Sequence, residues 1–136
     1  IYPVGAVNYL ADREFAGNVL VGFDWGSYVS WKLYPRVKVS LDSRFEVAYP
    51  PEVEAEQYAF FSAGPGWQRL LDAEPYRATD VILAPRFLDS RIHERLADLP
   101  GWRRVYRDAS FELFARESSA LPLVDRPGAS DEGAFP

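Results

Sequence analysis

The stretch that decides the fold is residues 17–31, which read GNVLVGFDWGSYVSW. Its first part, Val19 to Phe23, is a short apolar run with β-branched residues, a pattern typical of a buried strand. Asp24 follows directly, and a carboxylate at this point can accept the free N–H groups of a helix start. Helical spacing then continues until Pro35, through Trp25, Tyr28, Val29 and Leu33. The stretch therefore predicts a strand, a turn capped by Asp24 and a helix.

Predicted strands and helices alternate along the rest of the chain. Apolar residues at helical spacing predict helices over residues 4–16, after Pro50-Pro51 with Val53, Tyr58 and Phe61, around Trp67 to Leu71 and from Ile92 to Leu99. Strand patterns occur at residues 37–41 and 81–84, and a hairpin over residues 102–116 is expected to turn at Asp108-Ala109.

This alternation sets the predicted fold class. Strands that alternate with helices imply right-handed crossovers and a mainly parallel sheet. Residues 37–41 alternate between apolar and polar, which places them near a sheet edge, whereas residues 81–84 are apolar on both faces. We expect an α/β fold: a three-layer, mainly parallel Rossmann-like sheet with a C-terminal antiparallel hairpin.

The chain of 136 residues is expected to form a single α/β domain over residues 1–118 and a flexible tail over residues 119–136. Beyond Ser118, Pro, Gly, Ser and acidic residues dominate, and the apolar periodicity fades. The chain begins at Ile1 and contains no Met, so we expect a piece of a longer protein. No apolar stretch approaches the ~18 residues of a membrane helix, and the isolated domain is expected to be a monomer.

Composition narrows the possible functions. The net charge is -5 and no basic run occurs, so no nucleic-acid partner is expected. The absence of Cys excludes thiolate chemistry, and His93, the only histidine, is expected to be solvated or structural. The dinucleotide fingerprint, the P-loop and the Gly-x-Ser-x-Gly elbow are all missing. We therefore expect neither a cofactor nor a metal ion.

Polar residues follow three of the predicted strands. In an open α/β sheet, ligands bind beyond the carboxyl ends of the strands. If the first strand lies between the second and the third, this edge collects Asp24, Trp25, Asp42, Ser43, Arg44 and Arg86. Such a cleft suits a sugar, a polar peptide or a phosphate group better than an apolar cofactor. Asp24 as a helix cap only, and Asp42 and Arg44 as a local ion pair, remain open alternatives.

Three segments, taken in their order along the chain, resemble those of a known protein family. They are GNVLVGFDWGSYVSWKLYPRVKVSLDSR (residues 17–44), GWQRLLDAEPYRATDVILAP (residues 66–85) and LPGWRRVYRDASFELFAR (residues 99–116). Over about residues 3–116 the chain resembles the soluble C-terminal domains of bacterial multi-spanning membrane proteins related to GT-C glycosyltransferases. It is more distantly similar to the C-terminal domain of oligosaccharyltransferase catalytic subunits, where Trp-Trp-Asp-Tyr-Gly follows a strand. Here Asp24-Trp25-Gly26 differs in residue order, so acceptor-sequon recognition is not carried over.

The resemblance implies a role outside catalysis. In that superfamily the sugar-transfer carboxylates usually lie in loops of the membrane portion, so no activity is expected from this chain alone. The implied setting is the extracytoplasmic face of the bacterial cell membrane, as part of a membrane glycosyltransferase-related protein. The implied partners are the transmembrane portion of the parent protein and a glycan or polypeptide acceptor. The alternative is a free-standing small carbohydrate-active enzyme that uses Asp24 and Asp42 as an acid/base pair.

Overall fold

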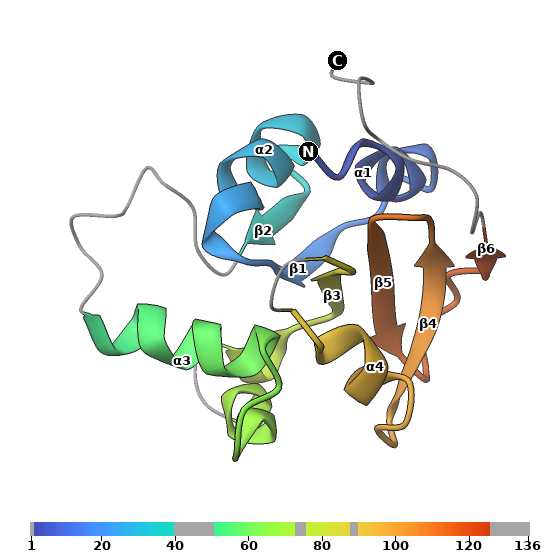
Figure 1. Cartoon of the computed structure of the whole chain (residues 1–136). Coiled ribbons are helices and arrows are strands. Elements are labelled where there is room, and N and C mark those ends of the chain that lie inside the picture. The colour runs from blue at the N-terminus through green and yellow to red at the C-terminus, as the bar shows by residue number, and fades with distance from the viewer. Residues whose placement is uncertain (1, 40–50, 73–75, 88–89, 126–136) are drawn as a thin grey trace.

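The computed structural model describes residues 2–39, 51–72, 76–87 and 90–125 (Figure 1). Four α-helices and two 3-10 helices accompany the strands in this part of the chain. The helices are α1 (Val4–Asp12), α2 (Phe23–Leu33), α3 (Pro51–Phe61), η2 (Trp67–Asp72), η3 (Tyr76–Ala78) and α4 (Ile92–Leu96). The strands are β1 (Gly17–Leu20), β2 (Val37–Val39), β3 (Val81–Pro85), β4 (Trp102–Arg107), β5 (Phe111–Arg116) and β6 (Val124–Asp125).

The described strands form one mixed sheet in the order β2-β1-β3-β5-β4-β6. β1 runs parallel to β2 and to β3, whereas β5 is antiparallel to both β3 and β4. The predicted α/β class, the C-terminal hairpin and the place of the first strand between the second and third are confirmed. The interior position expected for residues 81–84 is also correct, since every residue of β3 is buried.

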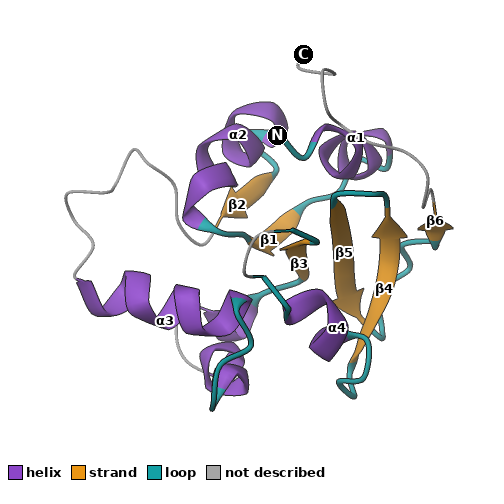
Figure 2. Cartoon of the chain, in the orientation of Figure 1, coloured by secondary structure: helices purple, strands orange, loops and turns teal. Residues whose placement is uncertain are grey.

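Side chains of the strands alternate between two apolar clusters. Val19, Val81 and Leu113 belong to a cluster that includes residues of α1 and α2. Leu20, Ile82 and Phe114, the next residue along in each case, belong to a second cluster with residues of α3, η2 and α4. Figure 2 shows α1 and α2 above the sheet and α3 and α4 below it in this view. The period-2 alternation thus gives each face of the sheet its own core.

The start of α2 differs from the prediction. The helix begins at Phe23, and its N-cap is Gly22 in extended conformation, a residue with no side chain to cap the helix. The prediction that Asp24 caps the helix is therefore wrong, because Asp24 is the second residue of the helix. The physical reason is that β1 already ends at Leu20, so the chain turns earlier than the apolar run suggests. In the first turn, a negative charge is still favoured by the helix dipole.

Residues 119–125 belong to the segment expected to be a flexible tail, and they are bound to the domain. Val124–Asp125 forms β6, which pairs in parallel with β4. Backbone carbonyl oxygens of the residues before β6 accept hydrogen bonds from the domain. The Arg103 guanidinium donates to the carbonyls of Ser119 and Leu121 at 2.6 Å each, and the Tyr9 hydroxyl donates to that of Pro122 at 2.5 Å. Composition missed this docking because backbone carbonyls, which carry no sequence signature, supply most of the contacts. Residues 126–136 lie outside the described residues.

Candidate functional site

The carboxyl ends of β1 and β3 lie together, as predicted for the candidate site. Because β1 and β3 are parallel, their carboxyl ends lie at the same edge of the sheet, followed in the chain by Trp25 and Arg86. Asp42, Ser43 and Arg44 fall outside the described residues, and so does the side chain of Asp24. Of the candidate residues at this edge, the structure shows the side chains of Trp25 and Arg86.

Trp25 packs as part of the core. Its ring lies edge-on to Phe87 at 5.8 Å and to Phe111 at 5.4 Å between centroids, and these two phenylalanines also contact each other edge-on. Such T-shaped contacts are a favoured geometry for aromatic rings. The indole, which is half-buried, joins the start of α2 to β5. Part of the indole surface is therefore occupied by these two rings.

Arg86 links the end of β3 to the hairpin between β4 and β5. Its guanidinium donates to the carbonyl oxygen of Asp108 at 2.6 Å, and its Nε lies 3.4 Å from a carboxylate oxygen of Glu112. Its backbone N–H donates to the carbonyl of Ser110 at 2.8 Å. Arg86 therefore stabilises the hairpin turn against the parallel half of the sheet.

Arg86, Glu112 and Arg104 form a charged group with Glu112 at its centre. The sequence analysis did not identify Glu112 as a candidate. Its side chain is only 3% exposed and lies between Arg86 and Arg104, whose guanidinium donates to it at 3.2 Å. A buried carboxylate needs such partners, because burial of an unpaired charge is costly. The available signal was a single charge in the otherwise apolar stretch FELFA, residues 111–115.

Asp108 fixes the turn of the hairpin. It is 1% exposed, and its carboxylate accepts hydrogen bonds from the Tyr106 hydroxyl at 2.6 Å and from the backbone N–H groups of Ser110 and Phe111 at 2.8 Å each. An aspartate that bonds the backbone two and three residues ahead is a common way to hold a turn. The predicted turn at Asp108-Ala109 is confirmed, and Asp108 stabilises it.

The ion pair of Arg107 and Asp125 extends the charged group to β6. Two hydrogen bonds, at 2.9 Å and 2.6 Å, join the guanidinium to both carboxylate oxygens. The bond from Arg107 is the main cause that lowers the pKa of Asp125, and the same bond raises the pKa of Arg107. The pairing matches planar groups of opposite charge, which gives the short strand β6 a defined register.

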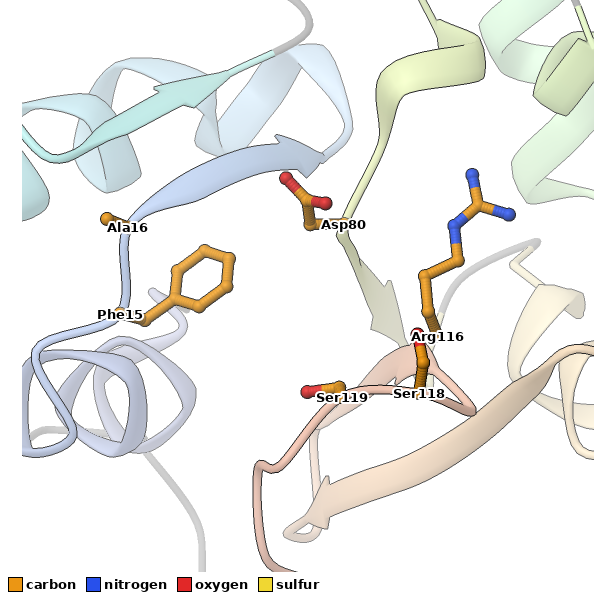
Figure 3. A pocket seen from close by; sticks show the side chains of 6 residues that line it. All are labelled: Phe15, Ala16, Asp80, Arg116, Ser118 and Ser119. Carbon is orange, nitrogen blue, oxygen red and sulfur yellow. The ribbon is translucent and has the colours of Figure 1, made fainter.

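A small pocket lies at the opposite edge of the sheet, near the amino ends of β1 and β3 (Figure 3). Its volume is about 230 Å³, and it is lined by Phe15, Ala16, Asp80, Arg116, Ser118 and Ser119. One carboxylate oxygen of Asp80 accepts the N–H of Asn18 at 2.9 Å. Gly17 makes this approach possible, because a Cβ there would lie 2.6 Å from that oxygen. The volume falls below the roughly 300 Å³ at which small-molecule sites begin.

A third surface lies where α2 leads into β2, and we call it the α2–β2 corner. It consists of the exposed residues Trp31, Lys32, Tyr34, Pro35 and Arg36. Trp31 is 66% exposed and Tyr34 is 74% exposed. The Lys32 ammonium lies 4.8 Å from the centroid of the Trp31 ring. Large exposed aromatic side chains that gather in one place are a feature of contact surfaces.

The described residues contain no group of three His, Cys, Asp or Glu side chains placed to bind a metal ion. His93 is partly buried on α4, and its Nε2 lies 3.9 Å from Glu94. Within the same described part of the chain, none of the helices has the length and apolar character needed to cross a membrane. No family model, no curated protein and no solved structure matches the chain.

Proposed function

We propose that the chain is a non-catalytic extracytoplasmic domain of a GT-C-like membrane glycosyltransferase-related protein, in which it contacts the membrane domain of its parent or a glycan acceptor. The observation that carries this proposal is the engagement of Trp25 and Arg86, the two candidate residues at the carboxyl edge whose side chains the structure describes. Arg86 is bound to Asp108 and Glu112, and Trp25 is packed against two phenylalanines. Side chains held in this way stabilise the domain, which fits an accessory role.

The fold supports the same proposal at a finer level. We propose that the domain is a three-layer Rossmann-like unit, in which two helical layers cover a mainly parallel sheet. Two separate apolar clusters, one on each set of alternating strand residues, support this arrangement. Such folds present their variable loops at the sheet edges, where a domain can contact a partner without changes in its core.

The α2–β2 corner supports contact with a membrane-bound partner. Trp and Tyr are enriched where proteins meet the membrane–water interface, because each combines an apolar ring with a polar group. Trp31 and Tyr34 have this character and are largely exposed. The corner therefore fits a domain that works close to a membrane.

Thiol labelling of the full-length parent protein tests the placement. The chain has no Cys, so in a parent whose other cysteines are replaced, Ala109→Cys puts one exposed thiol at the hairpin tip. Labelling by a membrane-impermeant maleimide on intact cells is expected. Labelling that requires cell lysis would contradict the extracytoplasmic placement.

An activity assay of the chain alone tests the non-catalytic role. We expect no turnover of glycosyl donors or glycosides. The alternative enzyme would use Asp24 and Asp42 as an acid/base pair, and turnover abolished by Asp24→Asn or Asp42→Asn would establish it in place of our proposal.

A further inference from the structure

We infer that the α2–β2 corner binds the surface of a membrane that contains anionic lipids, with the Trp31 and Tyr34 rings at the headgroup level and Lys32 and Arg36 against the lipid charges. This inference deepens the proposed function and rests on it for the position of the domain beside a membrane. Its physical basis is the combination of exposed aromatic and cationic residues within residues 31–36, where the Lys32 ammonium lies 4.8 Å from the centroid of the Trp31 ring.

Charge is distributed unevenly along this chain. The net charge is -5, yet the segment between Asp24 and Asp42 contains Lys32, Arg36 and Lys38 and no acidic residue. Lys32 and Lys38 are also the only lysines of the protein. A cationic segment within an acidic protein orients it toward an anionic surface, because the remaining faces are repelled.

The exposed ring of Trp31 packs against a buried aromatic residue of the same helix. Trp31 contacts Tyr28 at 6.4 Å between ring centroids, and Tyr28 contacts Tyr2 at 5.0 Å. Tyr28 itself is buried, at 7% exposure, in the cluster shared with α1 and α2. These contacts hold the tryptophan ring in place before it binds, which lowers the entropic cost of inserting it among lipid headgroups.

The cations of the corner suit lipid headgroups. The Lys32 ammonium lies 4.8 Å from the centroid of the Trp31 ring, so a lipid phosphate that binds this cation would lie beside the indole. The Arg36 guanidinium lies 3.8 Å from the carboxylate of Glu14, and the Glu14 side chain is 83% exposed. A weak surface pair of this kind is readily exchanged for a phosphate. Neutral sugar hydroxyls carry no charge for these cations to neutralise, whereas anionic headgroups do, so the cation-rich corner favours a lipid surface.

Vesicle sedimentation of the full chain tests the inference. The protein is expected to bind vesicles of phosphatidylglycerol mixed with phosphatidylcholine, and to bind phosphatidylcholine vesicles much more weakly. Lys32→Gln should lower the partition coefficient about fivefold, since a basic residue near an anionic surface contributes ~1 kcal/mol. Trp31→Ser should lower it by about tenfold or more, through the lost apolar contact. Added salt should weaken binding of the unmodified chain.

Matched variants elsewhere on the surface give the control. Tyr58 on α3 is 65% exposed and Arg95 on α4 is exposed. Tyr58→Ser and Arg95→Gln therefore remove an exposed aromatic side chain and an exposed basic side chain at sites distant from the corner. These two variants should bind vesicles like the unmodified chain. Equal binding to both vesicle types, equal losses in the control variants, or binding of soluble glycans that Trp31→Ser abolishes would each overturn the inference. The maleimide result is independent, so a failure here is distinguishable from a failure of the extracytoplasmic placement.

Discussion

The carboxyl edge of the sheet and the α2–β2 corner contain the same residue types in opposite surroundings. At the carboxyl edge, Glu112 is 3% exposed between two arginines, and the indole of Trp25 is packed among phenylalanines. At the corner, Trp31 is 66% exposed and the cations lie at the surface. Arginines and tryptophans therefore stabilise the fold at the first place and are available to a partner at the second. Burial, rather than residue type, separates these two roles.

Removal of the buried charge at the carboxyl edge should have the largest effect. Glu112→Gln keeps the shape of the side chain but leaves Arg86 and Arg104 without their shared carboxylate. We expect the free energy of unfolding to fall by about 3 kcal/mol, near the low end for a broken buried pair, because both arginines are partly exposed. Urea unfolding measures the change. Glu117→Gln, at an exposed position just after β5, is the control and should have little effect. Equal effects of the two variants would remove the distinction between the buried and the exposed region.

Truncation should have the next largest effect. A chain that ends at Ser118 loses β6, the Arg107–Asp125 ion pair and the carbonyl partners of Arg103. We expect a loss of about 2 kcal/mol in unfolding free energy, since hydrogen bonds to charged groups contribute the most. A chain that ends at Asp125 retains these contacts and is the control. Unchanged thermal midpoints in both truncated chains would restore the flexible tail over residues 119–136.

Tyr9 gives a test that depends on pH. Tyr9→Phe removes the hydrogen bond to Pro122 and should cost about 1 kcal/mol near neutral pH. Burial raises the pKa of Tyr9 above 10.0, while Arg13 and Arg103 partly oppose the shift. Above the unfolded pKa the unfolded chain releases this proton first, so stability should fall as pH rises until the folded pKa is reached. Unfolding from pH 9 upward should show a shallower decline in Tyr9→Phe. Identical slopes would mean that the hydroxyl ionises equally in both states.

Asp24 tests the corrected start of α2. Since Gly22 is the N-cap, we expect a carboxylate at the second helical position to act through the helix dipole. Asp24→Ala should therefore cost about 0.5 kcal/mol, and the loss should shrink at high salt. Asp24→Ser should be no more stable than Asp24→Ala, whereas a capping role predicts that serine restores most of the loss. Thermal unfolding of the three chains at two salt concentrations decides between the two roles.

The smallest effect is expected at the corner. Trp31→Ser changes a side chain that is 66% exposed, so the unfolding free energy should change by no more than about 0.5 kcal/mol. Urea unfolding of this variant beside Glu112→Gln compares the two regions directly. A loss comparable to that of Glu112→Gln would place Trp31 among the residues that stabilise the fold, and would weaken its assignment to a contact surface.

Local sequence patterns determined the elements and their neighbours. A continuous apolar run predicted β3, helical spacing predicted α3, and the polar alternation of residues 37–41 predicted the edge position of β2. These features depend on which residues a strand or helix can bury, and the order of residues carries that information. The turn at Asp108 also follows from local chemistry, since its carboxylate bonds the residues that come directly after it.

The tertiary structure alone decided which side chains are committed to the fold. Arg86 and Glu112 lie 26 positions apart in the chain, and only the antiparallel pairing of β3 with β5 brings them together. The docking of residues 119–125 likewise depends on carbonyl oxygens that any residue type can provide. Long-range contacts of this kind arise when separate elements pack, so no short segment contains them. For this protein, the sequence determined the strands and the candidate residues that follow them, and packing decided which of the described side chains are held within the fold and which stay exposed.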